Sequence, residues 1–382
     1  MNGDLAAVLA VDGGNSKTDL ALVAGDGTLL AAVRGPGVRS ADDLGPWLDA
    51  LAGLIARAQE DSGRGGGVTA STGRLAARHI SACVANADLP EEEERLAAAL
   101  RALGWSETVT VANDTFAVLR AGLDPATQPG PPHWGAAVTC GAGINCVAVD
   151  PSGRKTGYLA LGGITGDWGG GYGLGQQALW WAVRAEDGRG PQTALREAVA
   201  AHFGEPTVRD VAIGIHLGKI SEHSLLELAP VLMSVAAAGD EVAQDIVRRQ
   251  AEEISVMALT AMRRLGLTEL RTPVVLGGGV LTARDPLLIS EITNRITAAA
   301  PQATVIVVAV PPVAGAALLG LDHIGAGADA ERRLRAAYDG RGLSNETLAQ
   351  PLAVPRRRGP ASRSAVLRAS GTTMRSAREG GK

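Results

Sequence analysis

Two glycine-rich turns, each flanked by short apolar runs, are the clearest pattern in the chain. The first turn lies among apolar runs at residues 8–11, 20–23 and 28–33. The second has the same surroundings, with corresponding segments at 137–139, 146–149 and 155–161. The order strand, glycine loop, strand, turn and strand predicts a β-hairpin in each place. We therefore expect two related half-domains whose loops offer backbone N–H groups to an anion between them.

The remaining hydrophobic spacing predicts a mixed α/β chain, because apolar positions either recur at helical spacing or form short buried runs. Helices are expected at 46–59, 90–103, 115–121, 176–185, 192–203, 225–238 and 241–265. Strands are expected at 79–85, 108–111, 272–276 and 304–310. The last two have the character of buried parallel strands joined by a helix, and residues 312–324 would close the fold.

Shifts in composition divide the chain into parts. A proline-rich stretch near residues 125–134 marks a boundary, and a basic, low-complexity character begins after residue 325. We expect an N-terminal lobe at 1–122, a connection at 123–134, a C-terminal lobe at 135–325 and a tail at 326–382. Composition predicts that the tail is disordered, with contact to an anionic partner as the minor alternative.

Bulk composition narrows the classes of protein. The 382 residues are 46% hydrophobic and 20% charged, which is typical of a globular chain of two or three domains. A net charge of −4 gives no reason to expect nucleic acid or membrane as the main partner. Three cysteines cannot make a disulfide framework, and no signal peptide or membrane helix is evident. We therefore expect a cytoplasmic protein with reduced thiols.

The first glycine turn has the residue types of a phosphate site. An acid at a strand end, Asp12, precedes two glycines that let the backbone approach a ligand closely, and hydroxyl, amide and ammonium groups follow. Such a carboxylate can hold hydrated Mg²⁺ beside phosphates. An ordinary hairpin turn is the alternative, because Asp-Gly and Gly-Asn pairs are common in turns.

Four segments in order resemble the sugar kinase, Hsp70 and actin superfamily, in the branch of N-acetylglucosamine kinases and BadF/BadG/BcrA/BcrD ATPases. They are two phosphate loops, an adenosine loop and the helix after it, at residues 12–18, 139–143, 274–279 and 315–320. The resemblance implies two ribonuclease-H-like, actin-like ATPase lobes around a nucleotide cleft. It implies ATP contacts at Gly13, Gly14, Asn15, Ser16, Lys17, Thr18, Thr139, Gly141, Ala142, Gly143, Gly277, Gly278 and Gly279, and Mg²⁺ at Asp12.

Asn113 and Asp114 follow an expected strand and form the second candidate site. A carboxylate at the carboxyl end of a strand, facing a cleft, can take the proton of an attacking hydroxyl. In the kinases that this chain resembles, an aspartate at this position is the catalytic base, which implies that role for Asp114. An N-cap for the following helix is the alternative, and both roles can hold at once.

Two further segments concern the substrate. Asp167 lies in a Gly-Asp segment that resembles one lining the sugar site of N-acetylglucosamine kinases, although Trp168 replaces the usual Glu. Packing in the core is the commoner fate of a single Trp. Arg39 and Ser40 stand where relatives that bind N-acetylglucosamine usually carry Asn, which puts the acetamido sugar in doubt and favours an anionic or differently substituted substrate. Expected substrate contacts are therefore Asn113, Asp114, Asp167 and Arg39, with a solvent-exposed side chain as the alternative for Arg39.

Together these features predict an ATP- and Mg²⁺-dependent kinase that phosphorylates a hydroxyl of an amino sugar or related carbohydrate. We expect a small carbohydrate and a second copy of the chain as partners. One alternative is an ATPase activator of an acyl-CoA dehydratase, whose relatives bind an iron–sulfur cluster through cysteines between two subunits. Another is a non-catalytic nucleotide-binding sensor, against which the presence of Asp114 counts.

Overall fold

The computed structural model describes residues 5–37, 44–63, 75–123, 125–126, 128 and 133–340. Its two five-stranded sheets have the orders β3-β2-β1-β4-β5 and β10-β9-β6-β7-β8. The strands are β1 (Ala6–Gly13), β2 (Lys17–Val23), β3 (Leu29–Pro36), β4 (Ala77–Val84), β5 (Thr108–Asn113), β6 (Gly135–Cys140), β7 (Ile144–Val149), β8 (Lys155–Gly157), β9 (Pro273–Gly277) and β10 (Thr304–Val307).

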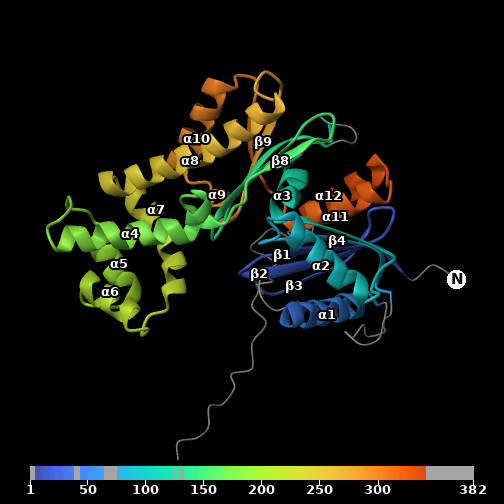
Figure 1. Cartoon of the computed structure of the whole chain (residues 1–382), viewed down its shortest axis with the longest axis horizontal. Helices are drawn as coiled ribbons and strands as arrows, with labels where there is room; N and C mark the ends of the chain where they lie inside the picture. The colour runs from blue at the N-terminus through green and yellow to red at the C-terminus, as the bar shows by residue number, and fades with distance from the viewer. Residues whose placement is uncertain are drawn as a thin grey trace, which may run out of the picture. The chain divides into compact units, whose positions relative to one another are not determined.

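The second sheet repeats the first, strand for strand. In each, the first three strands form an antiparallel meander and the last two add in parallel beside the first strand. In β1 every residue is buried, because helices cover both faces of the sheet. The expected hairpins and the expected pair of α/β lobes are confirmed (Figure 1).

One face of the first sheet is covered by α1 (Leu44–Asp61) and α2 (Pro90–Ala102). Trp47, Leu51 and Ile55 of α1 repeat at helical spacing and are buried there. α2 begins with Pro90, whose missing N–H suits the first turn, and the Glu92 side chain accepts hydrogen bonds from the backbone N–H groups of Asp88 and Leu89, both at 3.0 Å. That cap fixes the segment before α2, which belongs to the site below.

In each half, the helix that follows the last strand of the sheet packs against the sheet of the other half. α3 (Asp114–Gly122) follows β5 of the first sheet, yet its Val118 and Leu119 pack with Ala137 and Val275 of the second. α11 (Pro312–His323) follows β10 of the second sheet and packs on the first. A Cβ at Gly315 of α11 would lie 1.9 Å from a backbone oxygen of α3, so glycine permits the two helices to cross closely.

The C-terminal boundaries differ from the expectation. α11 was expected to belong to the C-terminal lobe at 135–325, but its apolar side chains cover the first sheet. The expected tail at 326–382 instead begins with α12 (Ala328–Gly340), whose Ala330, Leu334 and Tyr338 are buried. Glu331 of α12 accepts a 2.7 Å hydrogen bond from Arg120 of α3, and the Arg120 side chain is buried, with 2% of the residue exposed. The charged residues between the apolar positions of α12 hid its helical spacing. Residues 341–382 lie outside the described part.

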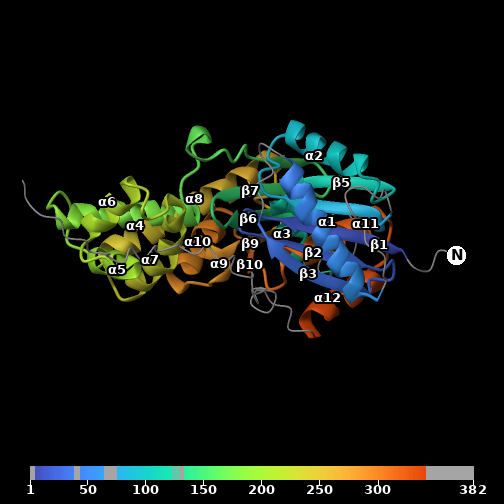
Figure 2. The ribbon, with the colours of Figure 1, turned by 90° about the horizontal axis from the view of Figure 1, so that it is seen from below.

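The second lobe carries most of the helices. They are α4 (Gly170–Glu186), α5 (Leu195–Phe203), α6 (Val208–His216), α7 (Leu228–Ala237), α8 (Glu241–Leu265), α9 (Gly279–Thr282) and α10 (Pro286–Ala299). α4 to α7 pack together and share one apolar core with α8, α10 and the second sheet (Figure 2). α8 has the bounds that its sequence predicts, whereas α6 was not expected. In the described ranges, no helix is both long enough and apolar enough to span a membrane.

Candidate active site

The two hairpin loops face a cavity of about 400 Å³, which we call the hairpin cavity. Strands β1 and β2 bring one loop to it, β6 and β7 the other, and the turn after β9 closes a third side. Its lining includes the predicted residues Asp12, Gly14, Asn15, Ser16, Lys17, Asn113, Asp114, Thr139, Gly141, Ala142, Gly143, Gly278 and Gly279. Most of the residues proposed for ATP therefore meet around one space.

Three predicted nucleotide contacts do not line this cavity. Gly13 packs beside Val84, and Thr18 is a buried residue of β2. A Cβ at Gly277 would lie 2.5 Å from Val118, so this glycine lets α3 approach the second sheet. Each of the three belongs to a strand, and the two glycines let neighbouring side chains approach the backbone closely.

The first loop is held by a charged ladder. The N–H of Gly14 donates to the Lys17 carbonyl at 2.8 Å, which closes the turn. Lys17 Nζ lies 3.0 Å from Asp19 Oδ2, and Arg34 approaches the same carboxylate at 2.5 and 2.7 Å. Arg34 and Asp19 are cross-strand neighbours of β3 and β2. Arg34 was not among the predicted site residues, but it also lines the cavity.

Asp12 carries a buried carboxylate group. It is 6% exposed, and its carboxylate accepts no hydrogen bond from the residues that the structure describes. Burial outweighs the opposing effect of the Lys17 and Arg34 charges and, together with the nearby Asp19 and Asp114, raises the pKa of Asp12 to about 7. A cation beside this carboxylate would offset that cost, so Asp12 fits the environment of a divalent ion.

The glycines of the second loop leave its backbone open to the hairpin cavity. The N–H of Gly141 donates a hydrogen bond to the Gly143 carbonyl at 3.0 Å. The first residues of α4 also hold the loop, because Gly171 N–H donates to Gly141 O at 2.7 Å and Tyr172 N–H donates to Ala142 O at 3.0 Å. A Cβ built at Gly141, Gly143 or Gly279 would have no protein atom within 4 Å. These glycines therefore leave room for a ligand that approaches the backbone closely.

Asp114 lies where β5 passes into α3. The cap of α3 is Asn113, whose side-chain oxygen accepts from Thr115 N–H at 2.9 Å. The capping role considered for Asp114 therefore belongs to its neighbour, and Asp114 lines the hairpin cavity. Burial raises its pKa to about 6, so it is ionised above neutral pH and can accept a proton.

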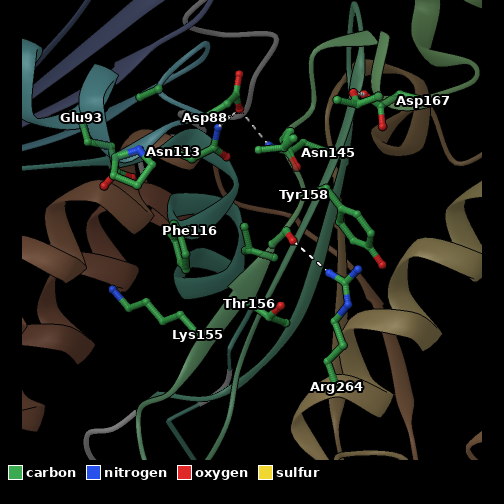
Figure 3. A pocket seen from close by; sticks show the side chains of 16 residues that line it. Asp88, Glu93, Asn113, Phe116, Asn145, Lys155, Thr156, Tyr158, Asp167 and Arg264 are labelled. Atoms are coloured by element: carbon green, nitrogen blue, oxygen red, sulfur yellow. Dashed lines mark hydrogen bonds between the residues drawn. The ribbon is translucent and has the colours of Figure 1, made fainter. Parts of the chain in front are cut away.

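A second cavity of about 540 Å³, the adjoining cavity, shares Asp88, Asn113 and Asn145 with the first (Figure 3). Predicted Asp167 lines it and accepts bonds from Gly162 N–H at 2.9 Å and from Thr165 Oγ1 at 2.7 Å. Lys155 and Arg264 line it too, each over an aromatic ring, Phe116 at 4.9 Å and Tyr158 at 4.8 Å. Carboxylates and amides thus face one part of this cavity, and cations face another.

Trp168 and Arg39 are the other two residues that the sequence brought into question for the substrate. Trp168 packs against the apolar core of the second lobe, with the Arg249 guanidinium 4.6 Å from its ring, as the core alternative predicts. Arg39 lies outside the described residues. Asp88 and Asn145 were not among the predicted site residues, although Asp88 lies in the segment after β4 and Asp114 comes directly after β5. Carboxyl ends of neighbouring parallel strands meet at one edge, and this rule could have found Asp88.

The cysteines do not contribute to the site surface. Cys83, Cys140 and Cys146 are free and buried, and burial raises the pKa of each thiol. Within the described ranges, no three His, Cys, Asp or Glu side chains converge on one point as metal ligands. A metal in the hairpin cavity would therefore take most of its ligands from water and phosphate.

The family follows from a match to the second half of this architecture. The model of the BadF/BadG/BcrA/BcrD ATPase family matches residues 126–320, slightly more than half of the chain. This chain belongs to the BadF/BadG/BcrA/BcrD ATPase family. The match covers the second hairpin loop, the glycine turn after β9 and most of α11, so the resemblance expected from the sequence is confirmed.

Individual relatives of this ATPase family member are sugar kinases by name. It is 24% identical over 277 residues to the N-acetylmuramic acid/N-acetylglucosamine kinase of Clostridium acetobutylicum, with 72% of this chain and 85% of that protein covered. It is 26% identical over 252 residues to the N-acetyl-D-glucosamine kinase of Dictyostelium discoideum, covering 63% and 75%. A crystal structure of a provisionally named N-acetylglucosamine kinase from Chromobacterium violaceum has the same fold, with a TM-score of 0.64, 22% identity and 83% and 99% coverage.

Proposed function

We propose that this protein is an ATP-dependent kinase that phosphorylates a hydroxyl of an amino sugar or a related carbohydrate. The observation that carries the proposal is the meeting of two open glycine loops and Asp114 around one cavity. Its curated relatives, which are named as kinases of N-acetylated amino sugars, support the substrate class.

In this proposal the hairpin cavity holds ATP. Backbone N–H groups of both loops bind the phosphates, and Gly278 and Gly279 approach the nucleoside. Asp12 would hold Mg²⁺ largely through water, and the ion would neutralise charge on the β- and γ-phosphoryl groups. The ladder of Lys17, Asp19 and Arg34 keeps the first loop in place.

The acceptor would occupy the adjoining cavity. Asn113 lines both cavities and Asp114 follows it directly, so a hydroxyl entering from the adjoining cavity would meet Asp114 as it reaches the phosphoryl group. Asp114 takes the proton of the acceptor hydroxyl, and the hydroxyl oxygen attacks the γ-phosphorus as the bond between that phosphorus and ADP breaks. Asp167, in the adjoining cavity, would hold acceptor hydroxyls.

The burial of the cysteines argues against an activator with a shared iron–sulfur cluster. Such a cluster needs thiolates at a subunit surface, whereas all three thiols are buried. A nucleotide sensor would not require a half-buried carboxylate such as Asp114 in the lining of the hairpin cavity. We retain the kinase as the function that the site supports best.

An ADP-coupled assay across a panel of amino sugars and their N-acetyl forms tests the proposal. We expect ADP release that depends on one or a few acceptors and falls to background in Asp114→Asn. ADP release that is independent of every acceptor would contradict a kinase and favour an ATPase.

A further inference from the structure

One carboxylate, Asp88, touches both lobes and both cavities. It lies between β4 and α2, and its Oδ1 accepts from Asn113 Nδ2 at 2.8 Å and from Asn145 Nδ2 at 3.1 Å (Figure 3). Asn113 ends β5 of the first sheet, whereas Asn145 belongs to β7 of the second. A single oxygen therefore joins the two halves at the place where their cavities meet.

The orientation of both asparagines is fixed by backbone groups. Asn113 Oδ1 accepts from Thr115 N–H at 2.9 Å, and Asn145 Oδ1 accepts from Cys146 N–H at 2.7 Å. Because a backbone N–H can only donate, each amide must turn its NH₂ group toward Asp88. The backbone of Asp88 is itself tied to Glu92 of α2. The arrangement is therefore held from three sides.

The other oxygen of Asp88 is available to a ligand. In the part of the chain that the structure describes, Oδ2 accepts no hydrogen bond, yet the residue lines both cavities. Burial, together with the nearby carboxylates of Asp114, Glu92, Asp167 and Glu93, raises the pKa of Asp88 to about 7. A neutral hydroxyl donor suits this position, because the nearby carboxylates would repel an anion beside Asp88.

We propose that Asp88 is a specificity-determining carboxylate of the acceptor site. Its Oδ2 accepts a hydrogen bond from an acceptor hydroxyl, while its Oδ1 holds the lobes at the spacing that brings that acceptor to Asp114. The inference rests on the proposed kinase function. It assigns the acceptor a second hydroxyl, beside the one that is phosphorylated.

Two variants separate the roles of the two oxygens. Asp88→Asn keeps an oxygen that can accept from Asn113 and Asn145, and it replaces Oδ2 by a donor. Asn145→Ala leaves the Asp88 carboxylate and removes its bond to the second lobe. Glu91→Gln, which removes an exposed carboxylate from the same first turn of α2, is the matched control.

The test measures steady-state kinetics with the preferred amino sugar and its monodeoxy analogues, with ATP affinity by calorimetry. We expect Asp88→Asn to raise the acceptor KM about ten- to hundredfold, since hydrogen bonds to charged groups are the stronger ones. ATP affinity and melting temperature should match those of Glu91→Gln. Asn145→Ala should lower kcat more than it raises KM.

The analogue series identifies the hydroxyl. One monodeoxy acceptor should be a poor substrate of the unmodified protein and of Glu91→Gln, but should match the parent sugar in Asp88→Asn. An unchanged acceptor KM in folded Asp88→Asn would overturn the inference and leave the kinase function standing, as would a loss of ATP affinity together with a lower melting temperature. Absence of acceptor-dependent turnover in the unmodified protein would overturn the proposed function, and the inference with it.

Discussion

The two hairpin loops share a topology and differ in chemistry. The first has charged groups on and beside it, namely Asp12, Lys17, Asp19 and Arg34. The second hairpin, residues 135–149, has no charged residue, and its glycines leave the backbone open. In the proposed kinase the two halves would have different roles: the first would supply fixed charge and a cation site, and the second would supply N–H donors for phosphate. Duplicated strands hold both at the same cavity, so each half can be altered separately.

The largest expected effect comes from Asp114, the acid that distinguishes the end of β5 from that of β10. Asp114→Asn keeps the shape of the side chain and leaves the Asn113 cap in place, but it cannot accept a proton. Loss of a general base costs about 10²- to 10⁴-fold in rate. Turnover should fall by this factor, with near-normal ATP affinity and melting temperature. If turnover survives here and is lost in Asp167→Asn, the base is Asp167.

Valine substitutions compare the loops directly. At Gly141 the new side chain meets no protein atom, so it should fill the phosphate space alone. At Gly14 a Cβ lies 3.1 Å from the Lys17 carbonyl, so the turn must also shift. Both variants should weaken ATP binding by about tenfold or more, which corresponds to about 1.4 kcal/mol. Only Gly14→Val should also lower the melting temperature. Calorimetry that finds normal ATP affinity in either folded variant contradicts the two-loop account.

The charged loop should also carry a pH-dependent cost that the uncharged loop lacks. The pKa of Asp12 rises from 3.8 unfolded to about 7 folded, so its contribution to stability is best below pH 3.8 and is lost as the pH rises through 7. Without Mg²⁺ and nucleotide, Asp12→Asn should be more stable at pH 8 by about 1–2 kcal/mol, below the ceiling of about 4 kcal/mol that the full shift implies. Urea titrations at pH 4 and 8 measure this; a gain that is equal at both values would show that burial of charge is not the cause.

The smallest effect is expected from removal of the residues after Leu352. Removal of residues after Leu352 should leave turnover and melting temperature nearly unchanged, because the sequence there lacks apolar periodicity. Removal from Ala328 onward is the contrasting variant. It takes away α12, with buried Leu334 and Tyr338, and leaves Arg120 without Glu331, so it should destabilise strongly. A marked loss in the shorter truncation would mean that the extreme C-terminus docks on the body.

Local patterns predicted much of this fold because the hairpins and helices are defined by neighbouring residues. Glycine turns between apolar runs located β1–β2 and β6–β7, and apolar spacing gave the bounds of α8. The crossing of α3 and α11 onto opposite sheets could not be read in this way, since both sheets offer similar apolar faces. In α12, three apolar positions separated by charges were too few to distinguish a helix from a basic tail.

The site was predictable to the same extent. Glycines and acids adjoining strands led to the loops and to Asp114. Asp88 and Asn145 were not predicted, because their contact forms only when the two lobes meet at one carboxylate oxygen. Gly13, Thr18 and Gly277 belong to the same motifs but point into packed surroundings, which sequence spacing alone does not distinguish.

Phosphorus NMR of the reaction products tests the central claim most directly. The protein is incubated with ATP, Mg²⁺ and each amino sugar, and the fate of the γ-phosphoryl group is followed. The account predicts a new phosphate-monoester resonance that requires both a sugar and Asp114 and grows as ATP is converted to ADP. Appearance of inorganic phosphate alone, equally with and without sugar, would contradict it.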